Sequence, residues 1–318
     1  MNKNSGPWKW SLTIFASREP VSLLIATIHN VLLSVNNNTV VDVLINGNTR
    51  LASDLVCQLD GSLGEDRRLR VWVIEFGDKA NAWNSYFHRI WDGQSIAFFM
   101  DGYVGLRSGS IELLGSALER ESQSVGGCGV PSGSNSSDKL AEKMLAEGGF
   151  HGNFCAIKGS VIETIKRRGI RIPLGMYRTD SLVGAWLAFG LDPSTNNWDI
   201  GRLLVVSEVT WDTPVKKWWR YSDIKSAISR KVRQSRGDLE NTAVRYFLGK
   251  QKMLPEALPS DVWRLVSSWV AACPEEWNKI KKLRLLSRYS FDSMSKFKGL
   301  DGAKELPRRL WPRESDRG

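Results

Sequence analysis

The chain contains 318 residues, of which 42% are hydrophobic and 25% are charged; this balance is typical of soluble globular proteins and excludes a chain disordered throughout. Its four cysteines include no C-x-x-C pair and its three histidines no H-E-x-x-H pair, which disfavours a disulfide scaffold, a zinc ribbon and a zinc hydrolase and suits a reducing cytoplasm. The formal net charge of +10 points to an anionic partner.

The N-terminal part alternates between apolar strands and amphipathic helices. Apolar runs predict four strands, at Leu12–Ala16, Val40–Ile45, Leu69–Phe76 and Ile96–Met100. Helices are expected at Val21–Val35, where Pro20 suits the start of a first turn, and at Lys79–Trp91. Buried strands joined by helices predict an α/β domain with a mainly parallel sheet.

Neither a secretory signal nor a membrane span is expected. The apolar run near the N-terminus is short and ends before Arg18. The most apolar stretch, Val21–Val35, contains His29 and Asn30 and falls short of the roughly 20 apolar residues that cross a bilayer. We therefore expect a cytoplasmic location, with a peripheral position on the inner face of a membrane as one option.

The middle of the chain adds further elements. Gly126–Ser137 is rich in glycine and serine and predicts a mobile loop. A short helix is expected at Asp138–Glu147, followed by a glycine-rich turn at Gly148–Asn153 and the apolar segment Phe154–Ile157. Two more helices and one strand are expected after it, at Ser160–Arg168, Asp180–Phe189 and Leu203–Val209.

The last third carries the excess charge. From Trp211 to Gly318 the sequence holds 24 basic and 13 acidic residues and half of the 14 tryptophans, whereas residues 1–210 carry a net charge of −1. Gly249, Pro255 and Pro259 favour a boundary, so we expect an α/β domain over residues 1–250 and a basic, tryptophan-containing helical region over residues 251–318.

That helical region permits two interpretations. One helix has an apolar face, and basic residues follow it, as shown by Val262, Leu265, Val266, Trp269 and Val270 and then by Lys281, Lys282, Arg284 and Arg288. Basic residues mixed with tryptophan and leucine suit an interfacial helix on an anionic membrane. The alternative is a helical cap packed on the α/β domain with solvated charges. Binding of nucleic acid is a third possibility and is disfavoured.

Polar residues follow each of the first four predicted strands. They are Ser17-Arg18-Glu19, Asn46-Gly47-Asn48, Gly77-Asp78-Lys79 and Asp101-Gly102-Tyr103. Ligands of open α/β sheets bind beyond these carboxyl ends. Neither a dinucleotide-binding G-x-G-x-x-G nor a P-loop is present. Asp101 can hold a divalent cation that binds a diphosphate, or it can be a solvated turn residue.

Taken in order, these segments resemble the family 2 glycosyltransferases, which have the GT-A fold. The similarity covers residues 10–245 and rests on the strand ends above and on three further segments, Gly77–Asn84, Thr179–Leu182 and Arg230–Gly237. The resemblance implies an inverting transfer of a sugar from a nucleotide-diphosphate sugar to a glycan or a lipid-linked saccharide.

The resemblance also implies roles for individual residues. Asp180 corresponds to the catalytic base, although aspartate also favours helix N-caps. A divalent cation, Mn²⁺ or Mg²⁺, is expected at Asp101. The turn with His151 and Asn153 is a candidate acceptor site or a plain tight turn. The donor nucleotide is expected to meet Ser17, Glu19, Asn46, Asn48, Lys79, Asn84, Asp101, Tyr103, Arg233 and Arg236. Alternatively, Lys79 and Asn84 belong to a polar helix start, and the two arginines belong to a solvated basic face. Gly126–Ser137 is either a lid that orders on donor binding or a disordered loop.

Two departures from the family pattern affect these roles. Tyr103 replaces the second aspartate of the metal motif, and Thr179 replaces the usual acidic neighbour of Asp180. A tyrosine is a poor ligand for Mg²⁺ or Mn²⁺. A degenerate, non-catalytic protein that binds a membrane or nucleic acid is therefore the main alternative. A nucleotidyltransferase is disfavoured, because Ser17-Arg18-Glu19-Pro20 is not a glycine-rich phosphate loop.

Overall fold

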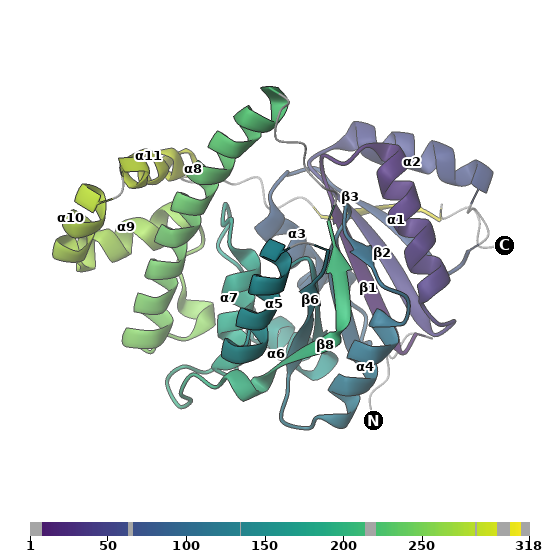
Figure 1. The fold of residues 1–318 in the computed structure, drawn as a ribbon, viewed down its shortest axis with the longest axis horizontal. Coiled ribbons are helices and arrows are strands. Elements are labelled where there is room, and N and C mark those ends of the chain that lie inside the picture. Colours follow the sequence, from purple (N-terminus) through teal and green to yellow (C-terminus); the bar gives the residue numbers. More distant parts are fainter. Residues whose placement is uncertain are drawn as a thin grey trace.

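The computed structural model describes residues 8–62, 66–133, 135–213, 221–283, 285–297 and 306–312. Nine strands in these ranges form one sheet with the order β5-β8-β6-β7-β4-β1-β2-β3-β9 (Figure 1). The strands are β1 (Trp10–Ala16), β2 (Thr39–Asn46), β3 (Leu69–Ile74), β4 (Ile96–Asp101), β5 (Gly105–Leu106), β6 (Gly126–Pro131), β7 (Phe154–Lys158), β8 (Leu203–Asp212) and β9 (Arg308–Trp311). No helix within these ranges is long and apolar enough to span a bilayer.

The centre of the sheet is parallel, as the sequence predicts. β1 pairs in parallel with β2 and β4, and β2 pairs in parallel with β3. Their carboxyl ends therefore meet at one edge of the sheet. Towards one side, β7 runs antiparallel to both β4 and β6, and β6 then runs parallel to β8. The first four predicted strands are confirmed, with shifts of one or two residues at their ends.

Helices cover both faces of the sheet. One face carries α1 (Val21–Ser34), α2 (Thr49–Ser62) and α4 (Ser110–Arg120), and the other carries α3 (Lys79–Ser85), α6 (Gly159–Arg168) and α7 (Thr179–Ala188). The sequence interpretation missed α2, although Leu51, Leu55 and Leu59 recur every four residues and all three are buried. The predicted Lys79–Trp91 helix consists of α3 and a following π-helical turn, Tyr86–Ile90.

The predicted loop at Gly126–Ser137 is wrong, and with it the idea of a lid in this segment. Gly126–Pro131 is the buried strand β6, and α5 (Asn135–Glu147) begins soon after it. The glycines let β6 lie close to β8, because a Cβ on Gly127 would lie 2.7 Å from the Leu204 carbonyl oxygen and one on Gly129 would lie 2.4 Å from that of Val209. Glycine here serves close strand packing rather than mobility.

Helices also form most of the chain after residue 220. They are α8 (Tyr221–Val244), α9 (Val262–Ala272), α10 (Pro274–Leu283) and α11 (Leu285–Met294). The apolar face of α9, with Val262, Leu265 and Trp269, belongs to the same core as α7. For this face, the interpretation of the region as a helical cap packed on the α/β domain is therefore confirmed. Trp218, Trp219 and Arg284 lie outside the described residues.

The chain then returns to the sheet, which a purely helical C-terminal region does not anticipate. β9 pairs antiparallel with β3, and Trp311 is buried against this edge. The expected domain boundary near residue 250 stays a prediction.

Candidate functional site

A lysine and a tyrosine hold the carboxylate at the end of β4. The Nζ of Lys79 lies 2.8 Å from Oδ1 of Asp101, and the hydroxyl of Tyr103 donates to Oδ2 at 3.0 Å. Burial opposes the charge of Lys79, but Asp101 and then Asp180 outweigh it and raise the pKa of this ammonium group above its usual value. Burial and the neighbouring Asp101 raise the pKa of Tyr103, so its hydroxyl remains a donor at neutral pH.

Asp180 lies in the first turn of α7 and faces the glycine-rich turn. Its Oδ2 accepts a hydrogen bond from the backbone N–H of Gly152 at 3.1 Å. A Cβ on Gly152 would lie 3.1 Å from the Cβ of Asp180, so this glycine permits the close approach. Oδ1 accepts no hydrogen bond from any residue in the described ranges. Gly152 was not among the predicted site residues, and only its position between His151 and Asn153 pointed to it.

His151 lies close to these charged groups. Its Nδ1 accepts from the backbone N–H of Asn153 at 3.2 Å, which places the proton of the neutral ring on Nε2. The ring packs on Trp211, with 4.8 Å between the ring centres. Burial lowers the pKa of His151; Asp180 and Asp101 oppose this effect, whereas Lys79 and Arg178 add to it. The structure therefore brings Asp101, Asp180, Lys79 and His151 near one another, and the roles assigned to them stay predictions.

The residues after β1 and β2 order each other. Oε2 of Glu19 accepts from the backbone N–H groups of Ser17 and Arg18 at 2.6 and 2.8 Å. The amide of Asn48 donates to the carbonyl oxygen of Ser17 at 2.7 Å, and Oδ1 of Asn46 accepts from the backbone N–H of Asp78 at 3.0 Å. These contacts connect the ends of β1, β2 and β3 into one polar edge.

Two of the predicted donor residues have structural contacts deeper in the fold. Asn84 is buried, and its amide both donates to and accepts from the backbone of Ile172 at 2.9 Å. Arg236 donates from Nε to Oε1 of the buried Glu240 at 3.0 Å and from Nη2 to the carbonyl oxygen of Gly175. These contacts hold the segment before α7 in place. Neither side chain forms a hydrogen bond or an ion pair with Asp101.

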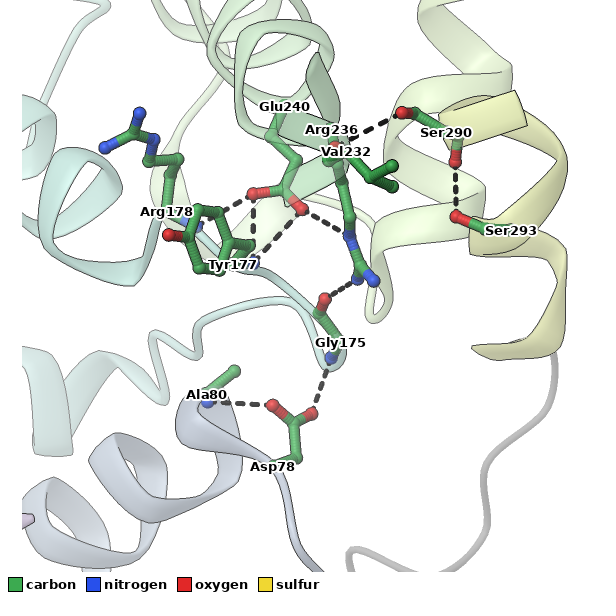
Figure 2. Close-up of polar contacts among 10 residues, drawn as sticks. All are labelled: Asp78, Ala80, Gly175, Tyr177, Arg178, Val232, Arg236, Glu240, Ser290 and Ser293. Carbon is green, nitrogen blue, oxygen red and sulfur yellow. Dashed lines mark hydrogen bonds and ion pairs between the residues drawn. The ribbon is translucent and has the colours of Figure 1, made fainter. Parts of the chain in front are cut away.

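Figure 2 shows the network that fixes the start of α7. Glu240 of α8 accepts from the backbone N–H of Tyr177 at 2.9 Å and from that of Arg178 at 2.8 Å. Asp78 caps α3 through the N–H of Ala80 at 2.9 Å and accepts from the N–H of Gly175 at 2.5 Å. α8, α3 and the loop before α7 are therefore tied together, which fixes the position of Asp180 relative to Lys79.

A divalent cation fits this site only if a bound substrate and water complete its coordination. No group of three or more histidine, cysteine, aspartate or glutamate side chains that could hold a metal occurs in the described part of the chain. Asp101 is one carboxylate, and Lys79 and Tyr103 contact its two oxygens. Mg²⁺-type sites commonly use one or two carboxylates, substrate phosphates and water. Asp101 fits a site of that kind, provided that Lys79 shares or leaves its oxygen.

A separate cavity of about 390 Å³ opens beside Tyr103. It is lined by one side of α1, including Leu23, Thr27 and Asn30, and by Val104 and Asp212 near β5 and β8. Of the predicted site residues it contacts Tyr103 alone, so it is distinct from the cluster around Asp180.

Comparison with known proteins reveals similarity in structure. No protein-family model and no curated protein matches the sequence. A solved structure of the mannosyltransferase PcManGT from Pyrobaculum calidifontis, in complex with GDP-Man and Mn²⁺, is similar over 89% of this chain and 84% of its own, with 13% identity and a TM-score of 0.56. This similarity shows that the chain has the GT-A fold, an α/β sheet flanked by helices, as the sequence predicts.

Two further solved structures are more distant. A mycobacterial protein has 10% identity, coverage of 78% of this chain and 77% of its own, and a TM-score of 0.47. GalNAc-T7 with UDP, GalNAc and Mn²⁺ has 12% identity, coverage of 66% and 43%, and a TM-score of 0.44. Membership of glycosyltransferase family 2 in particular stays a prediction.

Proposed function

We propose that the chain is an inverting glycosyltransferase that moves a sugar from a nucleotide-diphosphate sugar to an acceptor hydroxyl. The observation that carries this proposal is the position of Asp180 on a GT-A fold. Its carboxylate is held by the Gly152 N–H and lies close enough to Lys79 to help raise the pKa of that ammonium group. The PcManGT structure, determined with GDP-Man and Mn²⁺, supports a nucleotide-sugar donor and a divalent cation.

Asp180 acts as the general base in this mechanism. Its Oδ2 is fixed by the N–H of Gly152, and its Oδ1 takes the proton from the acceptor hydroxyl. The acceptor oxygen attacks the anomeric carbon from the face opposite to the diphosphate. The bond from that carbon to the phosphate oxygen breaks, and its electron pair leaves with the nucleoside diphosphate. Attack from the opposite face inverts the anomeric configuration.

Positive charge stabilises the departing diphosphate. Lys79 and Arg233 supply part of it from α3 and α8. A divalent cation held by Asp101, donor phosphates and water would add charge at the same place. The polar edge formed by Ser17, Glu19, Asn46 and Asn48 contacts the nucleoside, and His151 and Asn153 line the acceptor side.

The acceptor is a glycan or lipid-linked saccharide at a membrane surface. Leu283, Leu286 and Tyr289 are exposed at the junction of α10 and α11, among the exposed Lys281, Lys282 and Arg288. Exposed apolar side chains among basic ones suit the interface of an anionic bilayer. We assign a peripheral position on the cytoplasmic face of a membrane to the chain on this basis.

Replacing the base tests the proposed reaction. Purified protein is incubated with UDP- and GDP-sugars, Mn²⁺ and a membrane extract as the source of acceptor, and release of the nucleoside diphosphate is measured. Asp180→Asn is expected to lower turnover about 100- to 10,000-fold and to leave nucleoside-diphosphate affinity within about twofold. Asp138→Asn is the matched control, because Asp138 is the acidic residue in the first turn of α5 and is exposed. Unchanged turnover in Asp180→Asn would remove the base assignment.

Vesicle binding tests the membrane proposal separately. Leu283→Glu combined with Tyr289→Glu is expected to reduce sedimentation with phosphatidylglycerol vesicles, and added salt is expected to weaken the wild-type interaction. Leu33→Glu is the control, because Leu33 is also a highly exposed leucine, at 74% against 83% for Leu283, and lies on α1. Equal sedimentation of both variants, or none of the wild type, would contradict this surface.

A further inference from the structure

Arg178 is held by its backbone and leaves its side chain without a polar partner. Its N–H donates to Glu240 at 2.8 Å, so its main chain is fixed next to Asp180. Its Nε is buried and has no hydrogen-bond partner, and no carboxylate in the described ranges pairs with the guanidinium group. Figure 2 shows the guanidinium directed away from Glu240 and Arg236. A buried guanidinium nitrogen without an acceptor is unfavourable, so a ligand that brings oxygen acceptors is expected here.

A glycine in α8 makes room for this side chain. Gly237 lies inside a helix of 24 residues, where glycine is the least favourable residue after proline. A Cβ on Gly237 would lie 2.6 Å from Nε and 2.8 Å from Cγ of Arg178. The side chain of Arg178 therefore crosses α8 at the one point where the helix lacks a side chain. Glycine at this position lowers the stability of the helix but leaves space for the side chain of Arg178.

The charge of Arg178 reaches the site already described. It acts on His151, which also feels Asp180, Asp101 and Lys79. Arg233, four residues before Gly237 on α8, likewise has a buried Nε without a partner in the described part of the chain. Arg236, in contrast, is engaged by Glu240 and Gly175. The guanidinium of Arg178 lies over the Tyr177 ring, 5.5 Å from its centre, so neither its Nε nor that of Arg233 has an oxygen acceptor in the described part of the chain. Two buried guanidinium nitrogens without acceptors match a ligand with several anionic oxygens.

We propose that Arg178 binds a phosphate oxygen of the donor diphosphate, and that Gly237 positions it. This inference rests on the proposed function, because a nucleotide-sugar donor supplies the diphosphate. Arg178 is adjacent in sequence to the segment that carries the base, so binding of the diphosphate by Arg178 couples the donor to the position of Asp180. Arg236 acts as a positioning residue through Glu240, which holds the backbone of Arg178.

Calorimetric titration with five probes and Mn²⁺ tests the binding role directly. The probes are UDP, GDP, their nucleosides and inorganic pyrophosphate. Arg178→Ala is expected to weaken the nucleoside diphosphate that binds the wild type, and pyrophosphate, about 10- to 100-fold, and to leave the matching nucleoside unchanged. Arg178→Lys is expected to recover part of the loss, since lysine keeps the charge without the planar fork. Arg171→Ala, an exposed arginine before α7, is the control.

A double-mutant cycle tests the role of the glycine. Gly237→Ala is expected to displace Arg178 and to weaken the same phosphate-bearing probes, because the clashing atoms belong to a flexible side chain that can move while the fold persists. In the Arg178→Ala background, Gly237→Ala is expected to have no effect on binding and to raise the melting temperature. Gly249→Ala is the matched control, because a Cβ there meets nothing within 4 Å in the turn Arg245–Lys250.

The outcomes separate this inference from the function on which it rests. If the wild type binds neither UDP, GDP nor pyrophosphate, both fall. If the wild type binds a nucleoside diphosphate and Arg178→Ala binds it equally well, the inference about Arg178 is overturned while the proposed function stands. If Gly237→Ala weakens binding equally in both backgrounds, the positioning role of Gly237 is overturned.

Discussion

The Glu240 carboxylate is the buried anchor of the segment that carries Asp180, and its removal has a predictable cost. Glu240 is fully buried and pairs with Arg236, whose side chain is only 16% exposed. It also accepts the backbone N–H groups of Tyr177 and Arg178. Removing one partner of a buried ion pair costs about 3–5 kcal/mol, because the other charge remains buried. Glu240→Ala is therefore expected to be destabilised by that amount, which is about 5–8 °C in melting temperature for a chain of this size.

A surface pair with the same helical spacing provides the control. Lys143 and Glu147 are also four residues apart, but their atoms are 3.7 Å apart and both side chains are about two-thirds exposed. Glu147→Ala is expected to change stability by at most about 0.5 kcal/mol. Urea unfolding followed by tryptophan fluorescence measures both variants. A midpoint for Glu240→Ala that matches that of Glu147→Ala would refute the assigned role of this anchor.

Three further predictions follow from other contacts. Gly129→Ala places a Cβ 2.4 Å from the Val209 carbonyl oxygen, so it is expected to lose about 1–3 kcal/mol of unfolding free energy, and a wild-type denaturation curve would contradict the packing explanation for β6. Lys79→Met is expected to lower the Mn²⁺ concentration that supports nucleoside-diphosphate binding, because Lys79 competes for Asp101; an unchanged Mn²⁺ dependence in calorimetry would refute that competition. Burial lowers the pKa of His88, so the unfolded state takes up its proton first and stability falls as pH drops below about 6.5; His88→Gln is expected to flatten this part of the pH profile, and an equal slope would count against it.

The central strands could be predicted from the sequence, because a buried strand is recognisable from its own apolar residues and from the polar turns at its ends. Apolar runs bounded by polar turns identified β1 to β4, and these runs are buried in the structure. Composition gave the wrong prediction at Gly126–Pro131, because a glycine-rich segment indicates a loop when its neighbours in the fold are not known. Only the contact with Leu204 and Val209 on β8 shows why glycine is required there. Likewise β9 depends on pairing with β3, more than 230 residues earlier, which no local pattern records.

In the candidate site, too, the residues predicted correctly are those whose position follows from local sequence. Asp101, Lys79 and Tyr103 were predicted from their places after strands, and the structure brings them into direct contact. The sequence could not show that Asn84 and Arg236 are used by backbone groups of distant segments. It also gave no sign of Arg178, because its role depends on Gly237 and Glu240 of another helix.

The binding of a nucleoside diphosphate at the ends of β1 to β4 is the central claim, and a thermal-shift screen tests it most directly. UDP, GDP and CDP are each added to the purified chain with Mn²⁺ or with a chelator. One nucleotide is expected to raise the melting temperature, and Asp101→Asn is expected to remove the part of the shift that requires Mn²⁺. No shift with any nucleotide, or a shift that is identical in Asp101→Asn with and without Mn²⁺, would contradict the account.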